Sequence, residues 1–365
     1  MRLSLCMIVR NEKALLERCL RSIKDLVDEI VIVDTGSTDG SQDMARGLGA
    51  KVFATSWEQN FSKPRNKSLE EAHGRWILVL DADEQLLDRD RAALGDLLAR
   101  HTPDQGSPKV AFNLLQKSSF DEGRTSMLVP IVRLFPNRPE IRFEWPIHEQ
   151  VATSLIQEGI PILDTKIEIL HDGYADPARN IEKNKRNLKI LQDQIDTARD
   201  VYPLTHFFLA DSKLEGGDSE GALKSYQSCV RIAPPEDAIA KGAKIRIATC
   251  LTNLRRHAEA LATMPAASST DWHPELLVSK GQCEKALGRR QAACDAFTQV
   301  LSITDAAFNP PCNLGSVKLD AMLKLSSLLK EEGKDALAVK LLRSIVACHK
   351  AGQVLDKTWL DSVLN

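Results

Sequence analysis

The chain has 365 residues, which is long enough for two domains with separate hydrophobic cores. Its composition, with 43% hydrophobic and 27% charged residues, is that of an ordinary folded protein. The formal net charge of -2 gives no electrostatic reason to expect a nucleic-acid partner.

The N-terminal apolar run is too short to cross a membrane, and no small-residue cleavage site follows it. Eight cysteines are scattered without a CxxC pair or a histidine at metal-ligand spacing. This pattern favours buried thiols in a reducing compartment over disulfides or a zinc site. We therefore expect a cytoplasmic protein without a transmembrane segment.

Residues 1 to about 175 alternate between predicted strands and helices. Strands are expected at 4–9, 29–34, 51–55 and 76–80. The first helix between them is expected to end near Ile23, and the next two to cover 41–48 and 63–73. This rhythm predicts a doubly wound α/β sheet whose strands are mostly parallel. Looser strand patterns at 109–115, 128–135, 141–145 and 165–170, some of them antiparallel, make the predicted sheet mixed.

Acidic residues lie at the ends of two of these predicted strands. Asp34 ends one strand, and Asp81 and Asp83 follow the apolar run of the stretch WILVLDADEQ. The carboxyl ends of parallel strands meet at one edge of a sheet, where ligands bind. Asp81 and Asp83 can alternatively cap a helix expected through 86–99, but a cap needs only one acid. A D-x-D arrangement can hold Mg²⁺ or Mn²⁺ while phosphates and water fill the other positions.

After about residue 178 the strand pattern disappears. Residues 178–198 are typical of one long helix, and a short motif then recurs in which a glycine precedes an alanine by five positions. Copies begin at Gly217, Gly288 and Gly333, and a degenerate copy has Arg255 in the glycine position. The pattern resembles tetratricopeptide repeats, in which small residues allow close helix packing. We expect an all-α solenoid; the alternative is an unrelated helical bundle.

The expected organisation is an α/β domain over 1-175, a linker helix over 176-200 and a helical repeat domain over 201-365. Three segments of the first domain, CMIVRNE, EIVIVDTGSTDGS and NFSKPRNKSLEEAHGRWILVLDADE, resemble family 2 glycosyltransferases in order and spacing. The resemblance covers roughly residues 3–175. It is closest to the subgroup joined to tetratricopeptide repeats, which includes glycocin peptide glycosyltransferases and relatives of lipopolysaccharide-core glucosyltransferases.

This resemblance implies a GT-A fold, a nucleoside-diphosphate sugar as donor, Mn²⁺ or Mg²⁺ as cofactor, and inversion at the anomeric carbon. A UDP-sugar is the donor that the family implies. Asp34 and Thr35 stand where the family recognises the base and ribose, although Asp34 can also form an Asx-type turn. Arg65 and Asn66 match an Arg-Asn pair, in which the arginine can hold phosphate, pair with Asp81 or lie solvated on the surface.

The family also implies roles for the metal site. Asp81 would face the nucleotide or sugar and contribute to the metal site, and Asp83 would be the direct metal ligand. His171, at the end of the last predicted strand, would complete the metal or diphosphate site, because imidazole binds Mn²⁺ and also contacts phosphate. A purely structural histidine is the alternative.

The segment RLFPNRPEIRFEWPIHEQV resembles the Arg-Leu-Phe and His-Glu region of the same subgroup. An inverting transfer needs one base that deprotonates the acceptor, and Glu149 and His148 are the candidates. Trp145 can stack on the sugar or acceptor, or it can belong to the core. Trp145 and Pro146 stand where many relatives carry a glycine, a difference expected to reshape the acceptor pocket.

The sequence therefore predicts a metal-dependent inverting glycosyltransferase whose repeats help to select a peptide, protein or glycan acceptor. The repeats can also support a homo-oligomer. An alternative is a repeat-based interaction scaffold whose transferase-like domain is inactive. A nucleotidyltransferase would need a phosphate loop rich in Gly, Arg or Lys after the first strand. A dinucleotide-dependent dehydrogenase would need GxGxxG there, and the sequence VRNEKALLE provides neither.

Overall fold

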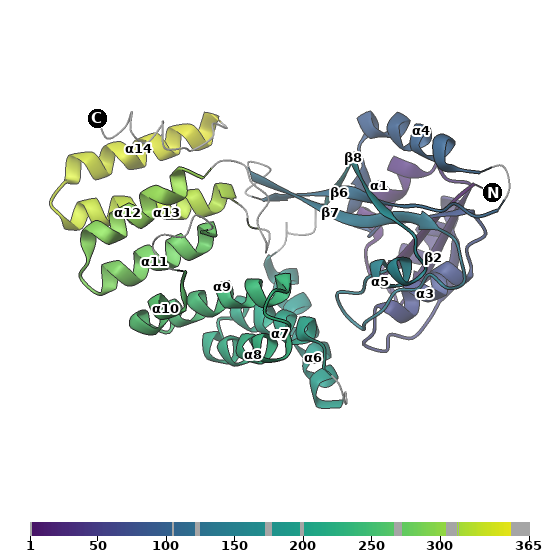
Figure 1. The fold of residues 1–365 in the computed structure, drawn as a ribbon. Helices are drawn as coiled ribbons and strands as arrows, with labels where there is room; N and C mark the ends of the chain where they lie inside the picture. Colours follow the sequence, from purple (N-terminus) through teal and green to yellow (C-terminus); the bar gives the residue numbers. More distant parts are fainter. Residues whose placement is uncertain are drawn as a thin grey trace. The chain divides into compact units, whose positions relative to one another are not determined.

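The computed structural model describes residues 2–103, 106–120, 125–171, 177–197, 201–265, 272–303, 312 and 314–351. The chain divides into two compact units, Met1–Pro177 and Ala178–Asn365, and each is described separately (Figure 1). The long helix that the sequence predicts near 178–198 falls in the second unit. Within the described ranges, no helix combines the length and apolar character needed to cross a bilayer.

The first unit is built on one mixed sheet of eight strands in the order β3-β2-β1-β4-β7-β6-β8-β5. The strands are β1 Leu3–Val9, β2 Glu29–Asp34, β3 Lys51–Ala54, β4 Trp76–Val79, β5 Glu84–Leu86, β6 Ala111–Phe120, β7 Thr125–Pro136 and β8 Ile162–His171. The helices are α1 Lys13–Ile23, α2 Ser41–Gly47, α3 Ser62–Glu70, η1 Asp88–Asp90, α4 Arg91–His101 and α5 Ala152–Gln157. The predicted α/β fold with a mixed sheet is confirmed.

The strands that carry the acidic residues are parallel neighbours. β1 pairs in parallel with β2 on one side and with β4 on the other, with Val9 opposite Asp34. The carboxyl ends of β1, β2 and β4 therefore lie at the same edge of the sheet. β7 joins β4 in antiparallel orientation, and β6 extends the sheet toward β8 and β5.

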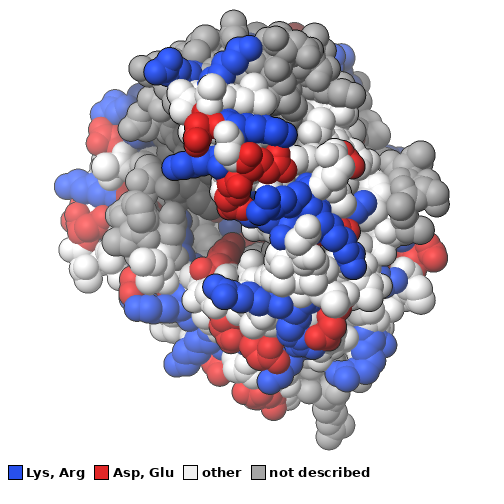
Figure 2. Space-filling model, turned by 90° about the vertical axis from the view of Figure 1, so that its left-hand side faces the viewer, with Lys and Arg blue, Asp and Glu red and all other residues white. Residues whose placement is uncertain are grey.

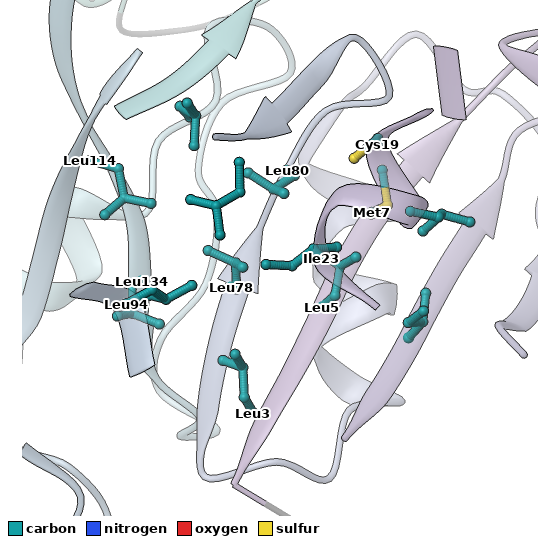
Figure 3. Packing of buried hydrophobic residues seen from close by; sticks show 14 of the residues in the cluster. Leu3, Leu5, Met7, Cys19, Ile23, Leu78, Leu80, Leu94, Leu114 and Leu134 are labelled. Atoms are coloured by element: carbon teal, nitrogen blue, oxygen red, sulfur yellow. The ribbon is translucent and has the colours of Figure 1, made fainter. Parts of the chain in front are cut away.

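Helices cover both faces of this sheet, as Figure 1 shows for α1 and α4 on one side and for α3 and α5 on the other. Alternate residues of β1 point to opposite faces. Leu3, Leu5 and Met7 pack with α1 and α4, and Figure 3 shows Leu5 and Met7 beside Ile23 and Cys19 of α1. Cys6 belongs to the second cluster, on the face of α3 and α5. Burial on both faces explains the continuous apolar runs of the central strands.

Two sequence predictions about secondary structure in this unit are wrong. The expected helix through 86–99 is preceded by the short strand β5 and a 3-10 turn, and α4 begins only at Arg91. The segment 141–145 is not a strand, because its only β-type pairing is an isolated bridge between Glu144 and Gln150. Its alternating residues instead place Ile141 and Phe143 in the core beneath α5.

The second unit consists of antiparallel helix pairs (Figure 1). The helices are α6 Pro177–Thr197, α7 Pro203–Glu215, α8 Ser219–Ile232, α9 Ala238–Asn253, α10 His257–Thr263, α11 Pro274–Ala286, α12 Arg290–Leu301, α13 Leu314–Glu331 and α14 Asp335–Ala351. Two clusters of buried apolar side chains connect successive pairs, which is the packing expected of helical repeats. The predicted all-α repeat architecture is confirmed.

The recurring motif has a direct structural basis. Gly217, Gly288 and Gly333 have positive φ angles of 84°, 78° and 75° at the turns between paired helices. Arg255 takes the same left-handed conformation, with φ 59°, in the degenerate copy. The alanines five positions later are buried, and so are the bulky residues Tyr226 and Phe297. Glycine is preferred at these turns because left-handed backbone carries no steric penalty without a Cβ atom.

Candidate active site

Asp34, the last residue of β2, is 1% exposed, and among the described residues hydrogen bonds engage only one of its carboxylate oxygens. Oδ1 accepts hydrogen bonds from the backbone N–H of Gly36 (3.0 Å) and Ser37 (2.9 Å) and from Nε2 of Gln42 (2.7 Å). The Asx-type turn considered from the sequence is therefore present. Oδ2 is buried and has no hydrogen-bond partner among the described residues. Leaving such an oxygen unsatisfied is costly, so this atom offers an acceptor position for a ligand donor.

Thr35 and Asn66 bind the backbone of the domain itself. The hydroxyl of Thr35 donates to the carbonyl of Val9 (3.3 Å). The side-chain amide of Asn66 donates to the carbonyl of Phe143 (2.9 Å) and accepts from its N–H (2.7 Å). These contacts fix the strand end and attach α3 to the segment that follows β7. Direct ligand binding by either side chain stays a prediction.

Arg65 of α3 joins two carboxylates that are distant in the sequence. Its side chain is 9% exposed, its Nε donates to Oε1 of Glu149 (2.6 Å), and its Nη2 donates to Oδ1 of Asp81 (2.7 Å). The guanidinium also lies over the ring of Phe143, 5.4 Å from the centroid. Three of the residues selected from the sequence are therefore in direct contact, and the alternative of a solvated surface arginine is wrong.

Sequence reasoning included a second arginine, Arg133, only as the first residue of the Arg-Leu-Phe segment and gave neither it nor its partners a role. Arg133 of β7 is 4% exposed, and its Nη2 donates to Oδ2 of Asp81 (2.8 Å) and to Oε1 of Glu84 (2.6 Å). Glu84 is fully buried, accepts from the N–H of Asp81 (2.9 Å), and also accepts from Nε2 of Gln116 (2.6 Å). Two features of the sequence could have indicated this network. One is an arginine, Arg133, inside a strand otherwise rich in apolar residues, and the other is Glu84, the third acid of WILVLDADEQ.

The charges in this network shift the pKa values of its acids in opposite directions. Burial opposes ionisation of Asp81, but Arg65 and Arg133 outweigh it and hold the pKa of this carboxyl well below its usual range. Burial raises the pKa of Glu84, Arg133 opposes the shift, and the negative charge of Asp81 adds to it. Asp81 is therefore ionised over the physiological pH range, and its charge anchors both arginines.

Asp83 and His171 form a separate pair at the junction of β5 and β8. Nε2 of His171 lies 3.6 Å from Oδ2 of Asp83, and Nδ1 lies 3.0 Å from the hydroxyl of Ser118. Burial lowers the pKa of His171, but the hydrogen bond and charge of Asp83 outweigh it and raise the pKa. The contact with Ser118, on the neighbouring strand β6, orients the imidazole ring.

The donor atoms of this pair suit a divalent cation. A carboxylate oxygen and an imidazole nitrogen can bind Mn²⁺ or Mg²⁺ when diphosphate oxygens and water supply the other ligands. Within the described ranges, no group of three or more His, Cys, Asp or Glu residues is arranged to hold a metal ion by itself. Asp83 and His171 fit a shared metal site, whereas both oxygens of Asp81 are engaged by arginines. Metal binding by Asp81 stays a prediction.

The loop that carries Trp145 and His148 is strained and attached to the start of α3. Both residues have positive φ angles, 68° and 53°. The carbonyl of Trp145 accepts from the hydroxyl of Ser62, and the carbonyl of Pro146 accepts from the N–H of Phe61. Burial lowers the pKa of His148 to about 4, so this imidazole is neutral at physiological pH. Stacking of Trp145 on a sugar stays a prediction.

Comparison with known proteins identifies relatives of both units. Residues 4–110 match the family described as Glycosyl transferase family 2, and residues 174–324 match the family described as Tetratricopeptide repeat-like domain. A TPR repeat-containing protein of Synechococcus elongatus is 31% identical over 356 residues, which cover 94% of this chain and 75% of that protein. This alignment extends across both units.

More distant similarities are also found. The SPbeta prophage-derived glycosyltransferase SunS of Bacillus subtilis is 23% identical over 192 residues, which cover 52% of this chain and 44% of SunS. The crystal structure of S. aureus TarS is 16% identical, with a TM-score of 0.42 over 71% of this chain and 54% of that chain. These values are too low to support a functional conclusion.

Proposed function

Because this chain belongs to the family 2 glycosyltransferases that carry a tetratricopeptide repeat-like domain, we propose that it transfers a sugar from a nucleoside-diphosphate sugar to an acceptor. The proposed donor is a UDP-sugar, the proposed acceptor is a peptide, protein or glycan, and the proposed reaction inverts the anomeric centre. The repeat unit contributes to the choice of acceptor in this proposal.

The observation that carries this proposal is the buried Oδ2 of Asp34, which has no hydrogen-bond partner among the described residues. This oxygen lies at the end of a parallel strand, at the edge of the sheet where ligands bind. The imide N–H of uracil or a ribose hydroxyl would provide the missing donor. Oδ1 already accepts three hydrogen bonds, so the orientation of the carboxylate is fixed before a ligand arrives.

Glu149 is the proposed general base. In the transfer step, the acceptor oxygen bonds to the anomeric carbon while the bond from this carbon to the diphosphate oxygen breaks. The acceptor proton moves to Glu149, and the nucleoside diphosphate leaves. Attack on the face opposite the leaving group inverts the anomeric centre. Arg65 supports this role because its hydrogen bond to Oε1 positions the carboxylate.

Asp83 and His171 would hold Mn²⁺ or Mg²⁺ against the diphosphate. The bound cation would neutralise the charge that develops on the leaving diphosphate. Ser118 would keep Nε2 of His171 directed toward this position, since its hydroxyl contacts Nδ1 of the same ring. Asp81 has a different proposed role, which is to hold Arg65 in place through its ionised carboxylate.

Calorimetric titration of the full chain with UDP, GDP and their sugar conjugates, in the presence of Mn²⁺, tests the donor assignment. We expect UDP to bind and Asp34→Asn to weaken binding by about tenfold or more, because one ligand hydrogen bond to a charged acceptor is lost. Asp39→Asn is the matched control, since Asp39 lies in the same loop and accepts hydrogen bonds from the N–H of Lys13 and Ser41.

Two results would contradict the proposal. Absence of binding by every nucleotide and nucleotide sugar would favour the alternative of an interaction scaffold with an inactive domain. Equal losses of nucleotide affinity in Asp34→Asn and Asp39→Asn would show that Asp34 only supports the structure of the loop. Release of nucleoside diphosphate from a bound donor then measures turnover, and the configuration of the product tests inversion.

A further inference from the structure

The repeat unit contains a pocket of about 760 Å³ at the edge where its helix pairs turn. The pocket lies where α9 and α11 end and α10 and α12 begin, and α13 forms another side. Its volume falls in the range of about 300–1,000 Å³ that is typical of ligand sites. Its charged and titratable lining residues are Arg255, His257, Lys285, Arg290, Lys324 and Glu331. Figure 2 faces this edge of the repeat unit, where Lys and Arg side chains lie among Asp and Glu side chains.

Four of these lining side chains are positive and one is negative. Lys285 is paired with Glu331 (2.7 Å), and Lys324 is paired with Asp320 (3.1 Å) outside the lining. Arg255 is exposed, and within the described ranges its guanidinium has neither a hydrogen bond nor an ion pair, whereas its backbone N–H donates to the carbonyl of Thr252 (3.0 Å). At each of these turns, the negative C-terminal end of one helix dipole lies beside the positive N-terminal end of the next. These partial charges offset each other, so the charged side chains determine the local electrostatic potential. The pocket therefore has excess positive charge, whereas the chain has a net charge of -2.

The backbone of Arg255 provides an independent observation. Its φ of 59° is the left-handed conformation that Gly217, Gly288 and Gly333 adopt at the equivalent turns. A residue with a Cβ atom costs about 1–2 kcal/mol in this conformation, whereas glycine adopts it without penalty. Arginine here thus lowers stability relative to the residue used in the other repeats, and strained residues of this kind concentrate at functional sites. Its side chain places a guanidinium at the rim of the pocket.

A third observation concerns His257, which also lines the pocket. Its Nδ1 is buried and has no hydrogen-bond partner among the described residues. A polar atom in this state is satisfied when a ligand supplies the partner. Arg255 and His257 belong to the same turn, so the cation and the imidazole lie on the same side of the pocket.

We propose that this pocket binds an acidic peptide segment of a protein partner, with carboxylates held by the guanidinium groups of Arg255 and Arg290. Arginine suits this role because its planar group binds a carboxylate through two parallel hydrogen bonds. The lining comes from three consecutive helix pairs, which matches an extended segment better than a single small anion. This site is independent of the proposed sugar-nucleotide site, because every lining residue lies between 252 and 331.

Fluorescence anisotropy of a labelled hexaglutamate peptide, titrated with the full chain at low salt, tests the proposal. We expect saturable binding that weakens as salt is added. Hexaglutamine of the same length should not bind. Arg255→Gly should weaken hexaglutamate binding by about tenfold or more, since a charge-assisted contact is lost. The same variant should have an unchanged or higher Tm, because it relieves the backbone strain at this turn.

Arg256→Gln is the matched control, because it removes the same charge from the neighbouring position. Arg256 is outside the pocket lining, and its Nε and Nη2 donate to Oε1 and Oε2 of Glu259 (2.8 Å and 2.7 Å). We expect Arg256→Gln to retain hexaglutamate affinity within about threefold, as an exposed pair contributes little.

Three outcomes would overturn the proposal. The first is that hexaglutamate does not bind, and the second is that Arg255→Gly and Arg256→Gln weaken binding equally. The third is that inorganic pyrophosphate binds in an Arg255-dependent manner while the peptide does not, which would make the pocket a site for small anions. Nucleotide binding, measured on the same variants, should stay unchanged, so failure of this proposal is distinguishable from failure of the proposed transferase function.

Discussion

At the scale of single residues, Glu149 and His148 offer neighbouring but unequal bases. Burial lowers the pKa of His148 to about 4, which makes its imidazole a weak proton acceptor, whereas a hydrogen bond from Arg65 fixes the position of the Glu149 side chain. Glu149→Gln keeps an oxygen that can accept the bond from Arg65 but removes the basic group. We expect transfer to slow by about 10²- to 10⁴-fold while donor affinity changes little. Single-turnover transfer and calorimetric binding measure the two quantities separately.

His148→Asn tests the other base. Asparagine tolerates the left-handed backbone that His148 adopts, with φ 53°, so the loop should keep its shape. A small change in the transfer rate of this variant would support Glu149 as the base. A loss of transfer activity in His148→Asn, together with full activity in Glu149→Gln, would identify His148 rather than Glu149 as the base.

The pair formed by Arg133 and Glu84 makes a prediction about stability. Glu84 is fully buried, so Arg133→Met would leave an uncompensated carboxylate inside the domain. We expect a loss of about 3–5 kcal/mol in the free energy of unfolding, measured with urea. Burial raises the pKa of Glu84, so its protonation should reduce the difference from the parent as the pH falls from neutral.

The double variant Arg133→Met with Glu84→Gln provides the control. Gln116 donates to position 84 in the parent and can bind the new amide oxygen, so the double variant should recover much of the lost stability. If it is as unstable as the single variant, lost packing rather than an unpaired charge explains the effect.

At the scale of elements, Glu29 fixes the start of β2 to its neighbours. Its buried carboxylate accepts from the hydroxyl of Ser4 (2.6 Å), from Lys51 (2.7 Å) and from the N–H of His73 (2.8 Å). Burial alone would raise its pKa, but these donors outweigh burial and lower the pKa from 4.5 to about 2. The stabilisation is therefore fully present above about pH 4.5 and is lost as the pH falls toward 2.

Glu29→Gln should consequently be less stable than the parent at neutral pH. The difference in free energy of unfolding should shrink as the pH falls from about 4.5 to 2, because the parent carboxylate becomes protonated over this range. Urea titrations of both proteins at several pH values measure it. Glu17→Gln, which breaks an exposed pair with Arg21, should change stability by about 0.5 kcal/mol or less at every pH. A constant difference for Glu29→Gln would contradict the linkage.

Individual elements differ in how far the sequence predicts them. The strands of the parallel half were predicted within one or two residues, because long apolar runs identify buried strands. β5 was missed because its three residues, Glu84–Leu86, carry no periodic pattern and are held by pairing with β8. The role of Arg133 was missed for a related reason. Its strand inserts beside β4 from fifty residues away, and the antiparallel register that places it beside Asp81 has no local signal.

At the scale of the whole molecule, the sequence pattern predicts a transition from strands to helices near residue 178. The units divide at Pro177 and Ala178. The sequence also indicates the left-handed turns between paired helices, because glycines occupy three of them, at Gly217, Gly288 and Gly333. Arg255 was recognised as a departure from the pattern, but its place in a pocket depends on three helix pairs that only the folded repeat unit brings together.

The separation of the cores predicts two unfolding transitions. Among the described residues, the clusters of buried apolar side chains lie either within 3–169 or within 207–341. Calorimetry of the full chain should therefore resolve two components with separate midpoints. UDP with Mn²⁺ should raise only the midpoint of the first unit, because a ligand stabilises the unit that binds it.

The variant Gly281→Ala tests whether the second calorimetric transition belongs to the repeat unit. A Cβ atom at Gly281 in α11 would lie 2.4 Å from a ring carbon of the buried Phe297, so the repeat core must shift, at a cost of about 1–3 kcal/mol. The midpoint of the repeat unit should fall while that of the first unit stays in place. Gly47→Ala in α2, where an added Cβ meets nothing within 4 Å, is the control and should not lower either midpoint. A single transition that Gly281→Ala and UDP shift together would show that the two cores unfold as one cooperative unit.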